Sequence, residues 1–159
     1  MIPVPGYEGA RVGVLGLGRS GLAAARALAA GGAVPVCWDD GEAARAAAEA
    51  EGFAIADLSR DRVWEEGLAL LCVSPGIPAL YPAPHKALEQ AWAHGVPVDN
   101  DVGLLFRALG EADFDDFDAP PRVVCITGSN GKSTTTALIG HILEAAGTPA
   151  QVGGNIGLG

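Results

Sequence analysis

Short apolar runs alternate with longer segments of helix-forming composition along the first 110 residues. The apolar runs predict strands over 11–17, 33–38, 68–74 and 96–100. The segments between them predict helices over 19–30, 41–52, 85–95 and 101–110, and two of these end at a glycine, Gly52 and Gly95. Alternating strands and helices indicate a parallel sheet covered by helices, and strands that are apolar on both sides fit a sheet buried on both faces.

An acidic, proline-containing segment then interrupts the pattern, and the pattern restarts after it. A strand is expected over 122–127, a helix over 131–146 and a further short strand at 150–154. We therefore expect a Rossmann-like domain over 1–110, an acidic linker over 111–121 and the beginning of a P-loop-type α/β domain over 122–159. Two strands and one helix are too few to bury a sheet of their own, so the second part looks like the opening of a larger domain.

Composition and charge limit the classes of partner. The net charge of −9 argues against nucleic acid, so an anionic ligand would need a locally built site. Glycine, proline or charge interrupts every apolar run, which predicts no membrane span, and the N-terminus lacks the features of a secretory signal. Cys37, Cys72 and Cys125 each lie near the end of an apolar run and are expected to be small core residues of strands in a reducing, cytoplasmic protein.

The segment GLGRSG, from Gly16 to Gly21, fits the G-x-G-x-x-G pattern between a predicted strand and a predicted helix. Such glycines permit a tight turn and a close approach of a ligand to the backbone, and the helix N-terminus suits phosphate oxygens. An acid follows about twenty residues later, at Asp39 or Asp40, where it could bind a ribose hydroxyl or a base edge. The pattern predicts a dinucleotide or sugar-nucleotide site; the alternative is a tight turn that binds nothing.

The segment TGSNGKST, residues 127–134, looks like a phosphate-binding loop that opens a helix, but it is shorter than the usual pattern, and Ile126 stands where the first glycine is expected. Backbone N–H groups from Gly128 to Lys132 can surround a phosphate chain, the Lys132 ammonium can lie among its oxygens, and the Ser133 hydroxyl is suited to Mg²⁺. The loop therefore predicts a nucleoside triphosphate. Two such loops in one chain indicate two nucleotides.

Four segments, at 16–28, 73–78, 126–134 and 153–157, together resemble the ATP-dependent Mur ligases of peptidoglycan synthesis. The shortened loop is the form this family uses. The resemblance implies a fragment, inactive alone, that holds the first domain and the start of the central ATPase domain. Within the family it implies the member that joins D-glutamate to UDP-N-acetylmuramoyl-L-alanine through an acyl phosphate. ATP and Mg²⁺ are then required, and a cytoplasmic monomer that binds neither nucleic acid nor membrane is expected.

The resemblance also implies roles for individual residues. The catalytic residues would be Lys132 and Asn155, and the Mg²⁺ ligand would be Ser133. The ATP phosphates would be held by Gly128, Ser129, Asn130, Gly131, Lys132, Ser133 and Thr134. The UDP-sugar would be bound by Gly18, Arg19, Ser20, Asp39, Ser74, Pro75, Gly76 and Asn155. The chain departs from the family at Asp40 and Gly41, where a hydroxyl and a basic residue are common, and at Gly103, where an acid is common.

Two other functions stay open on the residues alone. A nicotinamide-dependent oxidoreductase would use the first glycine loop and Asp39 but leaves the second loop unexplained. A non-catalytic nucleotide-binding module would use both loops without chemistry. The remaining arginines, Arg45 among them, are expected to be scattered surface charges, and His85, His94 and His141 are expected to lie at the surface or to be hydrogen-bonded.

Overall fold

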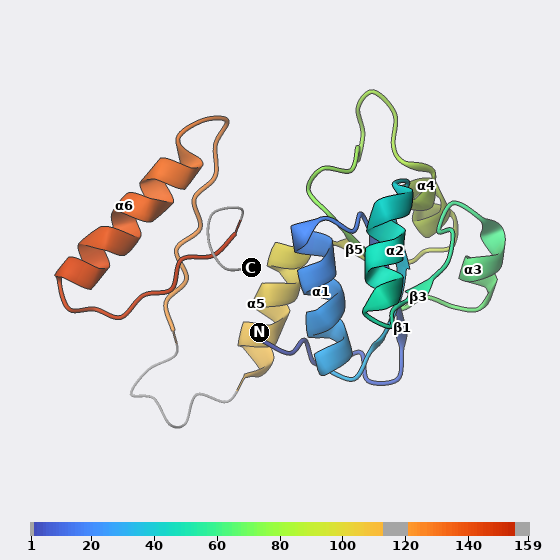
Figure 1. The fold of residues 1–159 in the computed structure, drawn as a ribbon, viewed down its shortest axis with the longest axis horizontal. Coiled ribbons are helices and arrows are strands. Elements are labelled where there is room, and N and C mark those ends of the chain that lie inside the picture. Colours follow the sequence, from blue (N-terminus) through green and yellow to red (C-terminus); the bar gives the residue numbers. More distant parts are fainter. Residues whose placement is uncertain (1, 113–120, 155–159) are drawn as a thin grey trace. The chain divides into compact units, whose positions relative to one another are not determined.

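A computed structural model describes residues 2–112 and 121–154, and the chain divides into two compact units, Met1–Ala112 and Asp113–Gly159 (Figure 1). The first unit contains a five-stranded sheet in the order β3-β2-β1-β4-β5, and every paired neighbour is parallel. Its strands are β1 (Arg11–Leu15), β2 (Val34–Trp38), β3 (Ala54–Ile55), β4 (Leu70–Val73) and β5 (Val98–Asp99). The predicted α/β class with a parallel sheet is confirmed.

The helices of this unit begin and end where local sequence signals place them. They are α1 (Arg19–Ala30), α2 (Glu42–Ala50), α3 (Asp61–Glu65), α4 (Lys86–Ala93) and α5 (Asp101–Glu111). After α1, the Gly32 N–H donates to Ala29 O and the Ala33 N–H donates to Leu28 O, both at 3.0 Å, with Gly32 at φ +87°. Gly52 and Gly95 end α2 and α4 with the same pair of bonds. These bonds satisfy carbonyls that a helix end leaves unpaired, which is why the terminal glycines predicted the helix ends correctly.

Side chains alternate across the sheet and fill two separate cores, as the period of a strand requires. On one face, Val12, Val14 and Cys72 pack in a cluster with α1 and with Leu104 of α5. On the other face, Leu71 and Val73 pack with residues of α3 and α4. The prediction of a sheet buried on both faces is confirmed, because β1 and β4 are buried along nearly their whole length.

Two elements between residues 53 and 67 carry no clear sequence signal. β3 has two residues and α3 has five, so neither is long enough to show a periodic pattern. Leu58 and Trp64 nevertheless fix this segment: Leu58 is fully buried, and the Trp64 Nε1–H donates to the Leu58 carbonyl at 2.9 Å. This contact holds α3 against the second core.

The departure at Gly103 has a local explanation. Asn100 caps α5 by accepting the Gly103 N–H at 3.0 Å. A Cβ placed on Gly103 would lie 1.8 Å from the Asp99 carboxylate, which already occupies that space. The glycine at this position therefore accommodates the Asp99 side chain.

The second unit holds one helix, α6 (Lys132–Ala145), within its described residues. The predictions of strands at 122–127 and 150–154 are wrong, because neither segment is part of a strand. A strand forms only beside a hydrogen-bonded neighbour, and neither segment pairs with one among the described residues. No side chain of α6 is buried, and Leu138 and Ile142 are each more than half exposed. Val123 and Val124 are also exposed, so the described part of this unit has no closed core.

Candidate functional site

The carboxyl ends of β1 and β4 carry two of the loops that hold the predicted sugar-nucleotide residues. β1 and β4 are neighbours in the sheet, but α1 packs on one face after β1, and α4 packs on the other face after β4. The loops that leave the two strands therefore diverge at the carboxyl edge of the sheet, which is where doubly wound folds generally bind their ligands. The loop from Gly16 to Gly18 follows β1, and the loop from Ser74 to Gly76 follows β4.

The first glycine loop is held close to its neighbours. Gly16 adopts φ +86°, and its N–H donates to the Trp38 carbonyl at 2.8 Å. A Cβ on Gly21 would lie 1.7 Å from the Gly16 carbonyl oxygen, so the first turn of α1 can approach the loop only as glycine. A Cβ on Gly18 would meet no atom within 4 Å. Gly16 and Gly21 thus serve the turn, while the open space is at Gly18, where a ligand can approach the backbone.

Asp39 joins the end of β2 to this loop. Its Oδ2 accepts the Leu17 N–H at 2.7 Å, and its Oδ1 accepts the Gly41 N–H at 2.8 Å. A carboxylate oxygen can accept more than one hydrogen bond, so both oxygens retain capacity for a ligand hydroxyl or N–H. The predicted site residue therefore also orients the loop that carries Gly18.

Ser74 joins the end of β4 to the same loop. Its backbone N–H donates to Leu15 O at 2.9 Å, and its hydroxyl donates to Gly16 O at 2.7 Å. Pro75 and Gly76 follow as exposed residues of the turn. The structure thus brings the loops that hold the predicted UDP-sugar residues Gly18, Arg19, Ser20, Asp39, Ser74, Pro75 and Gly76 to one edge of the sheet. Asn155 lies outside the described residues.

Arg45 of α2 contacts the turn that carries Asp39, a role that the sequence did not reveal. The expectation of a scattered surface charge is wrong, because its Nη1 donates to the carbonyls of Asp39 and Asp40 at 2.7 and 2.9 Å. Its guanidinium also lies 4.7 Å from the centre of the Trp38 ring. An arginine near the start of a helix is unfavourable toward the helix dipole, so the sequence indicates that Arg45 has a partner without showing which groups it contacts.

The phosphate-loop residues lie at the start of α6 in the second unit. Gly128 and Gly131 adopt φ +140° and +80°, conformations that favour glycine. The Lys132 ammonium donates to the Gly128 carbonyl and, at 3.2 Å, to the Ser129 carbonyl. Lys132 is thus folded over its own loop, and a phosphate would have to replace carbonyl oxygens as its partner.

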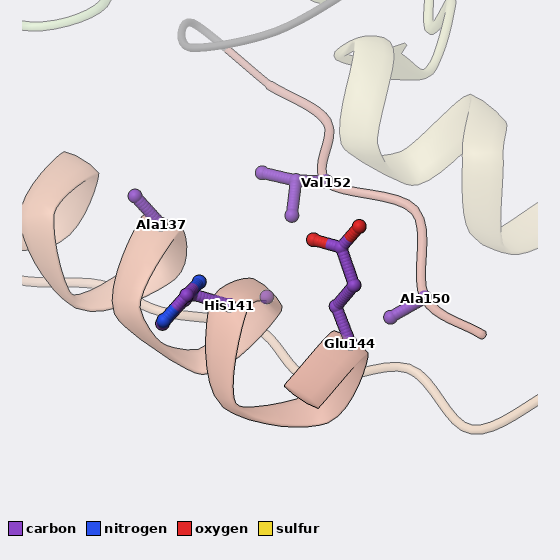
Figure 2. Close-up of a pocket in the computed structure, with 6 residues that line it drawn as sticks. Ala137, His141, Glu144, Ala150 and Val152 are labelled. Atoms are coloured by element: carbon purple, nitrogen blue, oxygen red, sulfur yellow. The ribbon is translucent and has the colours of Figure 1, made fainter. Parts of the chain in front are cut away.

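A separate shallow hollow of about 370 Å³ lies elsewhere on this unit, along α6 (Figure 2). His141 and Glu144 of α6 line it together with Ala150 and Val152. Val152 approaches the helix closely, since a Cβ on Gly140 would lie 2.6 Å from a Val152 methyl group. None of the predicted phosphate-binding residues lines this hollow, so it does not support the ATP site.

The cysteines divide into two environments. Cys37 and Cys72 are buried in strands, as predicted, and burial raises the pKa of each thiol to about 12. The same prediction is wrong for Cys125, which is exposed. The segment around Cys125 does not form the strand that was expected to bury it, because it pairs with no other strand in the described part of the unit.

A metal-binding cluster and a membrane-spanning helix are both absent from the residues that the structure describes. Within 2–112 and 121–154, no group of three or more His, Cys, Asp or Glu side chains could hold a metal ion. No helix in these ranges is both long and apolar enough to span a membrane.

Comparison with known proteins gives consistent relatives by sequence. No family model matches the chain. A protein named UDP-N-acetylmuramoylalanine--D-glutamate ligase from Cereibacter sphaeroides (strain KD131 / KCTC 12085) is 65% identical over 159 residues, which are 100% of this chain and 34% of the relative. A protein of the same name from Jannaschia sp. (strain CCS1) is 64% identical over 97% of this chain and 33% of the relative. Another from Ruegeria pomeroyi (strain ATCC 700808 / DSM 15171 / DSS-3) is 62% identical over 100% of this chain and 34% of the relative.

Solved structures give weaker likenesses. Shikimate dehydrogenase from Aquifex aeolicus aligns with 65% of this chain and 47% of its own, at a TM-score of 0.48 and 14% identity. Shikimate 5-dehydrogenase from Thermus thermophilus aligns with 66% of this chain and 48% of its own, at a TM-score of 0.45 and 22% identity. Neither likeness carries an inference about function.

The sequence relatives show which proteins this chain is homologous to. The chain spans about a third of the length of the curated relatives it matches. The resemblance to Mur ligases, first drawn from four short segments, is confirmed. Over its whole length the chain is homologous to the N-terminal third of proteins named UDP-N-acetylmuramoylalanine--D-glutamate ligase.

Proposed function

We propose that this chain supplies the sugar-nucleotide site and the ATP phosphate loop of a ligase that joins D-glutamate to UDP-N-acetylmuramoyl-L-alanine in peptidoglycan synthesis. The observation that carries the proposal is the 65% identity, over every residue of the chain, to a relative of that name. The remainder of the reaction machinery would then belong to the two thirds of the relatives that this chain does not match. We further propose a monomer that acts in the cytoplasm without nucleic acid or membrane.

The UDP-sugar site is assigned to the first unit, the Rossmann-like domain proposed over 1–110. The loops after β1, β2 and β4 meet at one edge of the sheet, through the bonds of Leu17 to Asp39 and of Ser74 to Gly16. We assign the diphosphate to the backbone at Gly18 and the start of α1, because a Cβ on Gly18 would meet no atom within 4 Å and the N-terminus of a twelve-residue helix favours phosphate oxygens. The uridine would lie toward Asp39 and the turn from Ser74 to Gly76.

The ATP phosphates are assigned to the loop from Gly128 to Thr134, at the opening of the domain proposed over 122–159. The donor set suits phosphate binding, because it combines an ammonium at Lys132, a hydroxyl at Ser133 and backbone N–H groups at the start of a fourteen-residue helix. Ser133 would hold Mg²⁺, which keeps several waters and phosphate oxygens as ligands and needs few protein groups. When bound, Mg²⁺ offsets the negative charge of the phosphates.

The proposed reaction brings two anions together. A carboxylate oxygen of UDP-N-acetylmuramoyl-L-alanine attacks the γ-phosphorus of ATP, ADP leaves, and an acyl phosphate results. The amine of D-glutamate then attacks the acyl carbon, phosphate leaves, and the nitrogen loses a proton as the amide forms. Lys132 would stabilise the charge on the phosphate oxygens during the first step. Asn155, which lies outside the described residues, stays a proposed catalytic and sugar-nucleotide-binding residue.

The proposal is tested by calorimetric titration of residues 1–159 with UDP-N-acetylmuramoyl-L-alanine and, in parallel, with NADH. Binding of the sugar-nucleotide and not of NADH is the expected result. Gly18→Val, which places a bulky side chain where the structure leaves open space, should abolish that binding without unfolding the unit. Binding of NADH alone would instead support an oxidoreductase, and binding of neither would contradict the assignment of a complete sugar-nucleotide site to the first unit.

A further inference from the structure

Asp40 and His85 face each other between the turn after β2 and the start of α4. The His85 Nε2 lies 3.4 Å from one carboxylate oxygen of Asp40 and 3.5 Å from the other. The Asp40 side chain is 78% exposed, whereas the His85 side chain is only 15% exposed. The pair therefore joins a carboxylate on the surface to a largely buried imidazole ring.

The other contacts of His85 fix its tautomer and its position. Its Nδ1 accepts the Ala87 N–H at 3.1 Å and so caps the N-terminus of α4. A nitrogen that accepts a hydrogen bond carries no proton, so the proton of the neutral ring is on Nε2, which donates toward Asp40. The His85 backbone N–H donates to Pro78 O at 3.0 Å, which closes the base of the loop between these residues.

Asp40 is fixed from the opposite side. Arg45 holds its backbone carbonyl at 2.9 Å, and the preceding residue, Asp39, binds the Leu17 N–H of the first glycine loop. The Asp40–His85 pair thus connects two segments of the proposed uridine site. One is the turn that carries Asp39, and the other is the β4–α4 loop that begins with Ser74 and ends at His85.

We propose that His85 is a positioning residue of the sugar-nucleotide site, which acts through Asp40 to set the separation of these two segments. The inference rests on the proposed function, because it assigns the uridine to the space between the Asp39 turn and the Ser74–Gly76 turn. Preorganisation of the two walls improves affinity because the ligand does not have to order them. The plainer explanation is that His85 only caps α4, and the two explanations predict different behaviour for a variant that keeps the cap.

The test measures UDP affinity by calorimetry and the urea midpoint of unfolding for residues 1–159. His85→Asn keeps a capping oxygen but is too short to reach Asp40, so its urea midpoint should stay near that of the parent chain. The affinity of His85→Asn for UDP should fall by roughly three- to five-fold, and that of Asp40→Ala should fall by the same factor. A loss of this size is expected when an exposed pair of side chains is broken. Asp40→Asn retains an acceptor for Nε2–H and should bind UDP as the parent does. His94→Asn, at the other end of α4, is the matched control and should also leave UDP affinity unchanged.

The double variant Asp40→Ala/His85→Asn decides whether the two side chains act together. We expect it to bind UDP no more weakly than either single variant, because each single change already removes the contact. Additive losses, or parent-like affinity in His85→Asn, would overturn the positioning role and leave the cap alone. If the parent chain fails to bind UDP, the proposed function of the first unit is wrong and the inference is overturned with it.

Discussion

Gly21 offers the sharpest test of the fold around the first glycine loop. A Cβ at this position would lie 1.7 Å from Gly16 O and 2.8 Å from the Ser74 hydroxyl oxygen. Since real Cβ atoms essentially never approach closer than 3.0 Å, Gly21→Ala forces the Gly16 oxygen to retreat by at least about 1.3 Å. That movement disturbs the bond from Ser74 Oγ to Gly16 O and the bond from the Gly16 N–H to Trp38 O.

The expected cost follows from these contacts. Overpacking contributes about 1–3 kcal/mol, the two hydrogen bonds contribute roughly 1 kcal/mol each, and the better helix propensity of alanine returns roughly 1 kcal/mol. The free energy of unfolding of the first unit should therefore fall by about 2–4 kcal/mol in Gly21→Ala. Affinity for the sugar-nucleotide should fall as well, because the displaced carbonyl belongs to the loop that carries Gly18.

Urea unfolding followed by tryptophan fluorescence measures this loss, because all three tryptophans belong to the first unit. Gly18→Ala is the matched control in the same loop: its Cβ meets no atom within 4 Å, so stability should change little. Gly110→Ala in α5, where the added Cβ also meets nothing, should be neutral or stabilising. A Gly21→Ala protein within about 0.5 kcal/mol of the parent, the scatter of neutral surface changes, would refute the close packing of α1 against the loop.

Three further predictions concern other parts of the chain. Lys132→Ala should weaken ATP binding by a ligase that contains this chain roughly ten-fold or more and leave sugar-nucleotide binding intact; equal losses of both would contradict two separate sites. The raised pKa values of Cys37 and Cys72 keep both thiols protonated at about pH 8, so Ellman's reagent should label Cys125 alone in the folded chain and all three cysteines in urea. Leu58→Ala should reduce the free energy of unfolding by about 2–5 kcal/mol in the same urea assay, because the side chain is fully buried, and a loss below about 1 kcal/mol would speak against the second core.

The parts of the fold that could be predicted are those with a long local signal. The bounds of α1 match the predicted 19–30, because an alanine-rich segment lies between a glycine loop and a glycine terminus. β3 and α3 are short elements whose formation depends on contacts with residues distant in the chain, such as the pairing of Val36 with Ala54. The strand expected at 122–127 failed for the converse reason, since an apolar run specifies a strand only when another strand pairs with it.

The residues of the candidate site could be proposed from the sequence, but the hydrogen bonds that they make could not. The glycine spacing and the acid at Asp39 located two of the three loops, because phosphate chemistry requires those residue types there. The bonds of Asp39 to the Leu17 backbone and of Arg45 to the carbonyls after β2 could not be predicted, because a sequence does not show where main-chain groups point. The role proposed for His85 depends on the same kind of information, and its position as a helix cap gave no hint of Asp40.

The hydrogen bond from Ser74 to Gly16 has a consequence for the order of folding. The two residues are 58 positions apart, and the bond can form only after β4 has paired beside β1. Closing so long a segment of chain is entropically costly, and parallel pairing across such a distance is slow. The helix after the glycine loop can therefore form early and locally, whereas the loop reaches its final shape only when the centre of the sheet closes. Ligand binding at this edge should consequently report completion of the sheet, and a nascent chain should gain it only after β4 has been synthesised.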